Sequence, residues 1–187
     1  MRIISGLFKG AKLINPNDIN IRPLKDLVKE SIFNSILHSK KFHIKFEKSV
    51  ILDAFSGTGS FGIECMSRGC KDVTFVESYN PALSILNQNV SKFNLKKFCK
   101  IINVNFLNFK FSSEFKKKFN LVFLDPPYKL LEINKVLEVV ISQEILDPRG
   151  ILILHRHKKS DDLIKHNIDI LDIRKYGLSK ILFLRLR

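Results

Sequence analysis

Apolar residues along the chain follow two spacings, one typical of strands buried on both faces and one typical of helices. Short continuous apolar runs predict buried strands, and we expect these at 50–52, 73–76, 100–104, 121–124 and 151–154. Between them, apolar residues that recur every three or four positions predict helices, which we expect at 24–37, 60–67, 131–142 and from Asn80-Pro81 onward. Asn80 is expected to cap its helix and Pro81 to take the first helical position.

The alternation of strand and helix begins at Val50 and favours a mainly parallel sheet with helices on both faces. Both ends of the chain depart from it. Residues 1–14 hold two short apolar runs around glycines, as in a small hairpin or extended arm, and the apolar runs 168–173 and 181–186 flank Tyr176-Gly177 like an antiparallel hairpin. We therefore expect a doubly wound α/β fold with seven strands over residues 49–187, preceded by a hairpin-and-helix extension over 1–48.

Composition narrows the class of protein. The 187 residues are 45% hydrophobic and 27% charged, which fits one globular domain and excludes a wholly disordered chain. No apolar run approaches the roughly 18 residues that span a bilayer. The N-terminus lacks the apolar core of a secretory signal, so we expect a cytoplasmic protein. The three cysteines form neither a C-x-x-C pair nor a zinc spacing, and we expect reduced thiols and no metal.

Charge points to a polyanionic partner. The chain carries 32 basic and 18 acidic side chains, a net charge of +14. Residues 1–48 hold ten basic and four acidic side chains, so the extension is the more basic part of the chain. We expect this extension to bind RNA, and the candidate phosphate contacts are Arg2, Lys9, Lys12, Arg22, Lys25 and Lys29.

A glycine-rich turn follows the first predicted strand. Asp53 directly follows that strand, and Gly57 and Gly59 allow a sharp turn into the next helix, where a ligand can approach the backbone closely. A carboxylate at Asp53 would repel a pyrophosphate but suits an ammonium group or a ribose hydroxyl. Glu77 ends the second strand, where an acid typically accepts hydrogen bonds from a ribose diol. Asn103 or Asn105, at the end of the third strand, is a weaker candidate for contact with an adenine edge.

A second motif, Asp125-Pro126-Pro127-Tyr128, follows the strand at 121–124. Its two prolines stiffen the loop and donate no backbone hydrogen bonds. The local polar groups are therefore acceptors, the Asp125 carboxylate and the Pro126 carbonyl, which suit an amino group. Tyr128 offers a ring on which a planar base can stack.

These motifs, in this order, resemble the class I S-adenosylmethionine methyltransferases that act on exocyclic amino groups of bases. Further blocks resemble one branch, the bacterial 16S ribosomal RNA guanine-N2 methyltransferases of the small-subunit methyltransferase D type, and they lie at 2–6, 10–13, 21–23 and 28–34. The resemblance covers nearly the whole chain. The chain departs from this branch at Lys25, where threonine is usual, at Lys29, which replaces an arginine, and at His155, where an acid is common.

The resemblance implies a Rossmann-like class I methyltransferase fold with S-adenosyl-L-methionine as methyl donor, S-adenosyl-L-homocysteine as product and no metal. The implied cofactor residues are Asp53, Phe55, Ser56, Gly57, Thr58, Gly59, Glu77, Asn105 and Phe106. The residues implied to hold the target guanine are Asp125, Pro126, Pro127 and Tyr128. The implied substrate is 16S rRNA, in a partly or fully assembled small subunit, and we expect the enzyme to be a monomer.

Other functions share parts of this pattern. A DNA adenine-N6 or cytosine-N4 methyltransferase, or a protein-glutamine methyltransferase, would use the same Asp-Pro-Pro-Tyr chemistry, although sequence-specific DNA enzymes usually carry a further recognition domain. A non-catalytic RNA-binding assembly factor is a third alternative, against which the intact glycines, Glu77 and Asp125 weigh. A nicotinamide oxidoreductase is a fourth, which no hydride-transfer motif supports.

Overall fold

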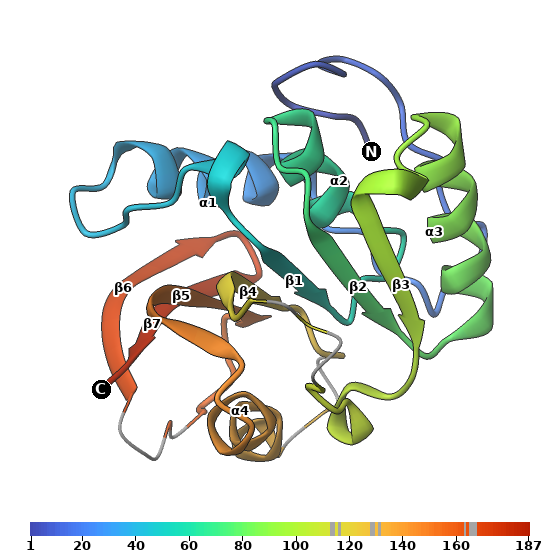
Figure 1. The fold of residues 1–187 in the computed structure, drawn as a ribbon. Helices are drawn as coiled ribbons and strands as arrows, with labels where there is room; N and C mark the ends of the chain where they lie inside the picture. The colour runs from blue at the N-terminus through green and yellow to red at the C-terminus, as the bar shows by residue number, and fades with distance from the viewer. Residues whose placement is uncertain (113–114, 116, 128–129, 131, 163, 165–167) are drawn as a thin grey trace.

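A seven-stranded sheet forms the centre of the molecule (Figure 1). The computed structural model describes residues 1–112, 115, 117–127, 130, 132–162, 164 and 168–187. Its strands are β1 (Ile51–Ala54), β2 (Val73–Glu77), β3 (Cys99–Asn103), β4 (Phe119–Leu124), β5 (Leu146–His157), β6 (Ile168–Tyr176) and β7 (Ser179–Leu186). Its α-helices are α1 (Asp26–His38), α2 (Ser60–Ser67), α3 (Asn80–Lys92) and α4 (Ile133–Ser142). Three short 3₁₀ turns are η1 (Phe46–Lys48), η2 (Lys96–Phe98) and η3 (Phe106–Asn108).

The strand order confirms the expected fold class. The sheet runs β3-β2-β1-β4-β5-β7-β6, with parallel pairing from β3 to β5 and antiparallel pairing of β7 with both β5 and β6. Chain connections cross from β1 outward to β3 and then back to β4, so the order reverses beside β1. In open sheets of this kind, ligands bind outside the carboxyl ends of the strands at this reversal.

Alternation along the central strands builds two cores, one on each face of the sheet. In β4, Leu121 and Phe123 face the core that α1, α2 and α3 cover, whereas Val122 and Leu124 face the core under α4. Figure 1 shows α4 on the opposite side of the sheet from the other three helices. The continuous apolar run of this strand is therefore the consequence of burial on both faces.

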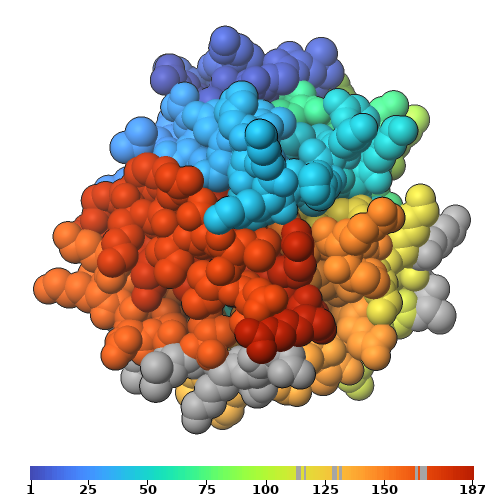
Figure 2. Space-filling view, turned by 90° about the vertical axis from the view of Figure 1, so that its left-hand side faces the viewer, coloured from blue at the N-terminus to red at the C-terminus, as the bar shows by residue number. Residues whose placement is uncertain are grey.

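Residues 1–48 pack against the sheet domain. The first residues form a small hairpin closed by an antiparallel bridge between Arg2 and Lys12, and Ile3 joins the core of α1. The segment after α1 reaches the C-terminal strands, where the Lys41 ammonium donates to the Leu171 carbonyl oxygen at 2.8 Å. Figure 2 shows this part of the extension in contact with the C-terminal hairpin. The extension and the sheet domain thus share one continuous apolar core.

One local expectation was wrong. Helix α3 begins at Asn80 itself, with Tyr79 as its N-cap and Pro81 in its first turn, so Asn80 is not the cap. The Glu77 carboxylate accepts hydrogen bonds from the backbone N–H groups of Ser78 and Tyr79, which turns the chain into the helix one residue earlier. Among the described residues, no helix combines the length and the apolar character that crossing a membrane requires.

Candidate active site

A cleft of about 670 Å³ lies at the carboxyl ends of the central strands. Its walls come from the loops after β1, β2, β3 and β4 and from residues 19–24 of the extension. Many residues that the sequence predicted as functional lie on these walls, and they are Arg22, Asp53, Phe55, Ser56, Gly57, Thr58, Glu77, Asn105, Asp125 and Pro127. The cleft therefore joins the glycine turn to the Asp-Pro-Pro corner.

The turn between β1 and α2 is held by its own polar groups. The buried Asp53 carboxylate accepts a hydrogen bond from the Gly62 N–H at 2.9 Å, and the Ser56 hydroxyl donates to the Asp53 and Val76 carbonyl oxygens. Phe55 adopts a positive φ of 59°, a conformation that concentrates at functional sites in proteins. Burial raises the pKa of Asp53 well above its usual range, and the nearby carboxylates of Asp125 and Glu77 add to this effect against the Gly62 hydrogen bond.

Gly59 shapes the turn between β1 and α2 and is not one of the residues that line the cleft. It adopts a φ of +79°, and a β-carbon there would lie 2.3 Å from the Leu86 Cδ1 atom. Gly57, by contrast, has a φ of +54° and no heavy atom within 4 Å of a β-carbon built on it. Gly57 therefore faces open space on the wall of the cleft, where a ligand can approach its backbone.

Glu77 links this turn to the start of α3. One carboxylate oxygen accepts from the Gly57 N–H at 2.7 Å, and the other accepts from the Ser78 and Tyr79 N–H groups at 2.8 and 2.7 Å. The acid thus fixes the shape of the glycine turn, and it also lines the cleft.

In the loop after β3, Leu107 rather than the predicted Phe106 lies on the wall of the cleft. The Asn105 side-chain oxygen accepts from the Leu107 N–H at 3.0 Å and caps η3. Phe106 is buried and packs against Phe55, with ring centroids 5.3 Å apart, and its side chain is not on the wall of the cleft. Leu107 lies there instead, because the 3₁₀ turn directs the larger aromatic ring into the core beside Phe109.

In the Asp-Pro-Pro corner, the Asp125 carboxylate lies between the Arg22 guanidinium and the His155 ring. One Asp125 oxygen accepts a hydrogen bond from the Arg22 guanidinium at 2.8 Å and lies 2.9 Å from the His155 Nδ1 atom. The other ring nitrogen of His155 lies 2.8 Å from the Ser179 hydroxyl. Pro126 is buried and Pro127 is exposed on the cleft, whereas Tyr128 lies outside the described residues.

Sequence reasoning missed Arg156, which supports this corner from the end of β5. Its buried guanidinium donates to the Leu130 carbonyl oxygen at 2.8 Å and to the Asp162 carboxylate, and it lies 3.5 Å from the Pro127 carbonyl oxygen. Arginine forks match such paired acceptors, and buried charges in proteins are normally paired. The signal in the sequence is a charged residue two positions after the end of the apolar run of β5.

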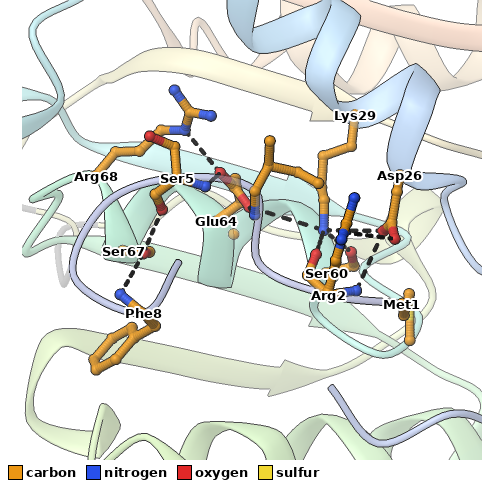
Figure 3. Close-up of polar contacts among 12 residues, drawn as sticks. Met1, Arg2, Ser5, Phe8, Asp26, Lys29, Ser60, Glu64, Ser67 and Arg68 are labelled. Carbon is orange, nitrogen blue, oxygen red and sulfur yellow. Dashed lines mark hydrogen bonds and ion pairs between the residues drawn. The ribbon is translucent and has the colours of Figure 1, made fainter. Parts of the chain in front are cut away.

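The candidate RNA contacts divide into two groups. Five are exposed, and they are Arg2, Lys9, Lys12, Arg22 and Lys25. Lys29 is wrong as a surface contact, because its side chain is 0% exposed and its ammonium is enclosed by the N-terminal arm and α2 (Figure 3). Lys29 lies four residues before Phe33 and three before Ile32, so it shares the buried face of α1 with these apolar residues. No cluster of three potential metal ligands is found in the part of the chain that the structure describes.

Comparisons with known proteins identify relatives along the whole chain. The chain is 29% identical to the ribosomal RNA small subunit methyltransferase D of Haemophilus influenzae, over 95% of this chain and 90% of that protein. The protein of the same name from Buchnera aphidicola (subspecies Baizongia pistaciae) is 27% identical over 88% of this chain and 80% of its own length.

Solved structures agree with this relationship. A Haemophilus influenzae structure superposes with a TM-score of 0.76 at 27% identity, covering 99% of this chain and 97% of its own. An Escherichia coli structure has a TM-score of 0.82 at 22% identity, covering 100% and 97%, and shows the same fold. The family model described as conserved hypothetical protein 95 matches residues 1–185. The chain therefore belongs to this family, that of the small-subunit methyltransferase D proteins within the class I S-adenosylmethionine methyltransferases.

Proposed function

We propose that this protein transfers a methyl group from S-adenosylmethionine to the exocyclic N2 amino group of a guanine in 16S rRNA. The family membership supports methyltransferase chemistry on ribosomal RNA. The observation that carries the finer proposal is the single cleft that joins the glycine turn after β1 to the Asp125 corner after β4. A methyl donor at the first and an amino acceptor at the second would meet within it.

The residues of the cleft fit this cofactor. Three carboxylates, those of Asp53, Glu77 and Asp125, line the same cleft, which suits a ligand that carries both an ammonium and a sulfonium charge. Asp53 would hold the ammonium, Glu77 the ribose hydroxyls, and the Asn105 segment the adenine. When bound, S-adenosylmethionine supplies a methyl group that its sulfonium already activates. The Glu77 and Asp125 carboxylates in this cleft would repel a dianionic pyrophosphate, which weighs against a nicotinamide cofactor.

The Asp125 corner would orient the guanine. The N2 lone pair is delocalised into the ring, so the amine is a weak nucleophile. Hydrogen bonds from N2–H to the Asp125 carboxylate and the Pro126 carbonyl would hold it in line for attack, and such positioning can lower a barrier by roughly 7–11 kcal/mol. The carboxylate would also stabilise positive charge as it develops on nitrogen. Arg22 and His155 both contact the same Asp125 oxygen, so the second oxygen of this carboxylate would accept the hydrogen bond from the amine.

The substrate must be unstacked, because a paired or stacked guanine hides N2. Exposed basic residues of the extension, among them Lys9, Lys12 and Lys25, would bind phosphates around the extruded base. The extension also supplies residues 19–24 to the cleft wall, so the same segment would contact both the RNA and the reacting base. A monomer acting in the cytoplasm on an assembled or partly assembled small subunit is the setting we predict.

Transfer from cofactor with a radioactive methyl group tests the proposal. The purified protein would be offered small subunits lacking base methylation, naked 16S RNA, genomic DNA and total protein, each as a separate acceptor. We expect label only in the two ribosomal acceptors, recovered as N2-methylguanosine after nuclease digestion. Label in DNA as N6-methyladenine or N4-methylcytosine would favour the DNA alternative, and cofactor binding without any transfer would favour an assembly factor.

A further inference from the structure

A buried lysine lies behind the glycine turn, among polar groups that connect the N-terminal arm to α2 (Figure 3). The Lys29 ammonium, carried by α1, donates to the Arg2 carbonyl oxygen at 2.7 Å and to the Ser60 hydroxyl oxygen at 3.0 Å. Its two acidic neighbours, Glu64 and Asp26, each lie 3.8 Å away. Burial lowers the pKa of Lys29, while the charges of Glu64 and Asp26 oppose this shift.

Most of this cluster has a structural role that does not involve the cleft. The Glu64 carboxylate accepts from the Ile4 and Ser5 N–H groups at 2.7 and 3.0 Å, and the Ser67 hydroxyl donates to the Ser5 carbonyl oxygen at 2.6 Å. These contacts attach the arm to α2. The bond from Lys29 to Ser60 is different, because Ser60 lines the cleft and makes no contact with the arm among the bonds described.

The direction of this bond leaves a donor at the cleft. An ammonium can only donate, so the Ser60 oxygen accepts, and its own proton must point elsewhere. Ser60 is 4% exposed, and within the described residues its hydroxyl has no acceptor. The backbone N–H groups of Ser60 and Phe61, at the first turn of the eight-residue helix α2, likewise have no acceptor within the described residues.

Donors and an acceptor therefore lie side by side at the start of α2. Gly62, two residues after Ser60, donates its N–H to Asp53, which fixes the carboxylate next to this first turn. An α-amino acid presents an ammonium and a carboxylate on the same carbon, and it needs an acceptor and a donor set in just this proximity. Asp53 suits the ammonium, and the Ser60 hydroxyl with the first N–H groups of α2 suits the carboxylate.

We propose that Ser60, oriented by Lys29, binds the α-carboxylate of the methionine part of the cofactor. Lys29 is then a positioning residue for the cofactor and not an RNA contact, and Ser60 is a binding residue. This inference rests on the proposed function, since it assumes that S-adenosylmethionine occupies the cleft.

Calorimetric binding of two ligands tests the assignment without requiring methyl transfer. S-adenosylmethionine carries the carboxylate, whereas decarboxylated S-adenosylmethionine keeps the adenosine, the sulfonium and the amine. We expect Ser60→Ala to weaken binding of the first ligand by about tenfold or more, as for a hydrogen bond to a charged group, and to change binding of the second by less than twofold. Lys29→Met should show the same selectivity, and Lys29→Arg, which keeps a donor, should restore most of the affinity.

Ser67→Ala is the matched control, since it removes a buried hydroxyl of the same helix that bonds the arm and not the cleft. It should leave the ratio of the two affinities unchanged. Equal loss of both ligands in Ser60→Ala, or no loss of either, would overturn the assignment. If the wild-type protein binds neither ligand, the proposed function itself fails. Ser60→Ala retains the buried ion pairs of Lys29, so the test stands even if Lys29→Met does not fold.

Discussion

Replacement of Asp125 by alanine should separate methyl transfer from cofactor binding. In the structure one oxygen of this mostly buried carboxylate accepts from Arg22 at 2.8 Å and lies 2.9 Å from the His155 ring. Neither neighbour belongs to the glycine turn that would hold the cofactor. The substitution therefore removes the acceptor for the target amine and leaves the turn in place.

The size of the effect follows from the site. Loss of one preorganised hydrogen-bonding group from an active site typically costs about 10²–10³ in rate, and removal of the negative charge beside the amine acts in the same direction. We expect the transfer rate to fall by about this factor or more. Cofactor affinity should fall far less than the transfer rate, because Asp125 follows β4 and lies outside the glycine turn and its Glu77 contact, which would hold the cofactor.

Single-turnover transfer to methylation-deficient small subunits, together with calorimetric titration of the cofactor, measures both quantities. Asp125→Asn is the companion variant, since it keeps the shape and an acceptor oxygen but loses the charge, and it should retain more activity than alanine. Wild-type transfer by Asp125→Ala would refute the assignment of this corner to the amino group. A parallel loss of cofactor binding would show that the corner serves the cofactor instead.

Three further changes probe the surroundings of the cleft. Because burial raises the pKa of Asp53 above its ordinary 3.8, the folded state holds a proton that the unfolded state releases between these two pKa values. The melting temperature should therefore fall as pH rises from 3.8 through the raised pKa. Asp53→Asn should flatten this pH dependence of the melting temperature and weaken cofactor binding. In Arg156→Lys, a single ammonium cannot donate to the loop carbonyl oxygens and to the Asp162 carboxylate with the geometry of a guanidinium. We expect kcat to fall about 10-fold or more in steady-state assays, with unchanged cofactor affinity in binding assays. Gly59→Ala combines a positive φ with a clash at Leu86, whereas Gly10→Ala, at φ +84°, meets no heavy atom within 4 Å. In urea unfolding, both variants should lose about 1–2 kcal/mol of unfolding free energy from backbone strain, and Gly59→Ala should lose more because of the clash. Equal losses in the two variants would contradict the clash.

The sequence determined the fold class and the main elements of the site. Continuous apolar runs and helical spacing predicted the five parallel strands and the C-terminal hairpin, because burial on both faces of a sheet requires such runs. Asp53, Glu77 and Asp125 each end a predicted strand, and parallel strands present these ends at one edge of the sheet. These three residues therefore meet at the edge of the sheet where the structure has the cleft.

Only the tertiary structure decided which polar side chains face that cleft and which are enclosed. Lys29 and Arg22 belong to the same basic extension, yet one is buried against α2 and the other reaches a carboxylate 103 residues away along the chain. Arg156 supports the loop after β4 from β5, and Phe106 turns into the core. Sequence spacing gives the period of an element but not what packs against each of its faces, and burial, hydrogen bonding and charge pairing depend on that packing.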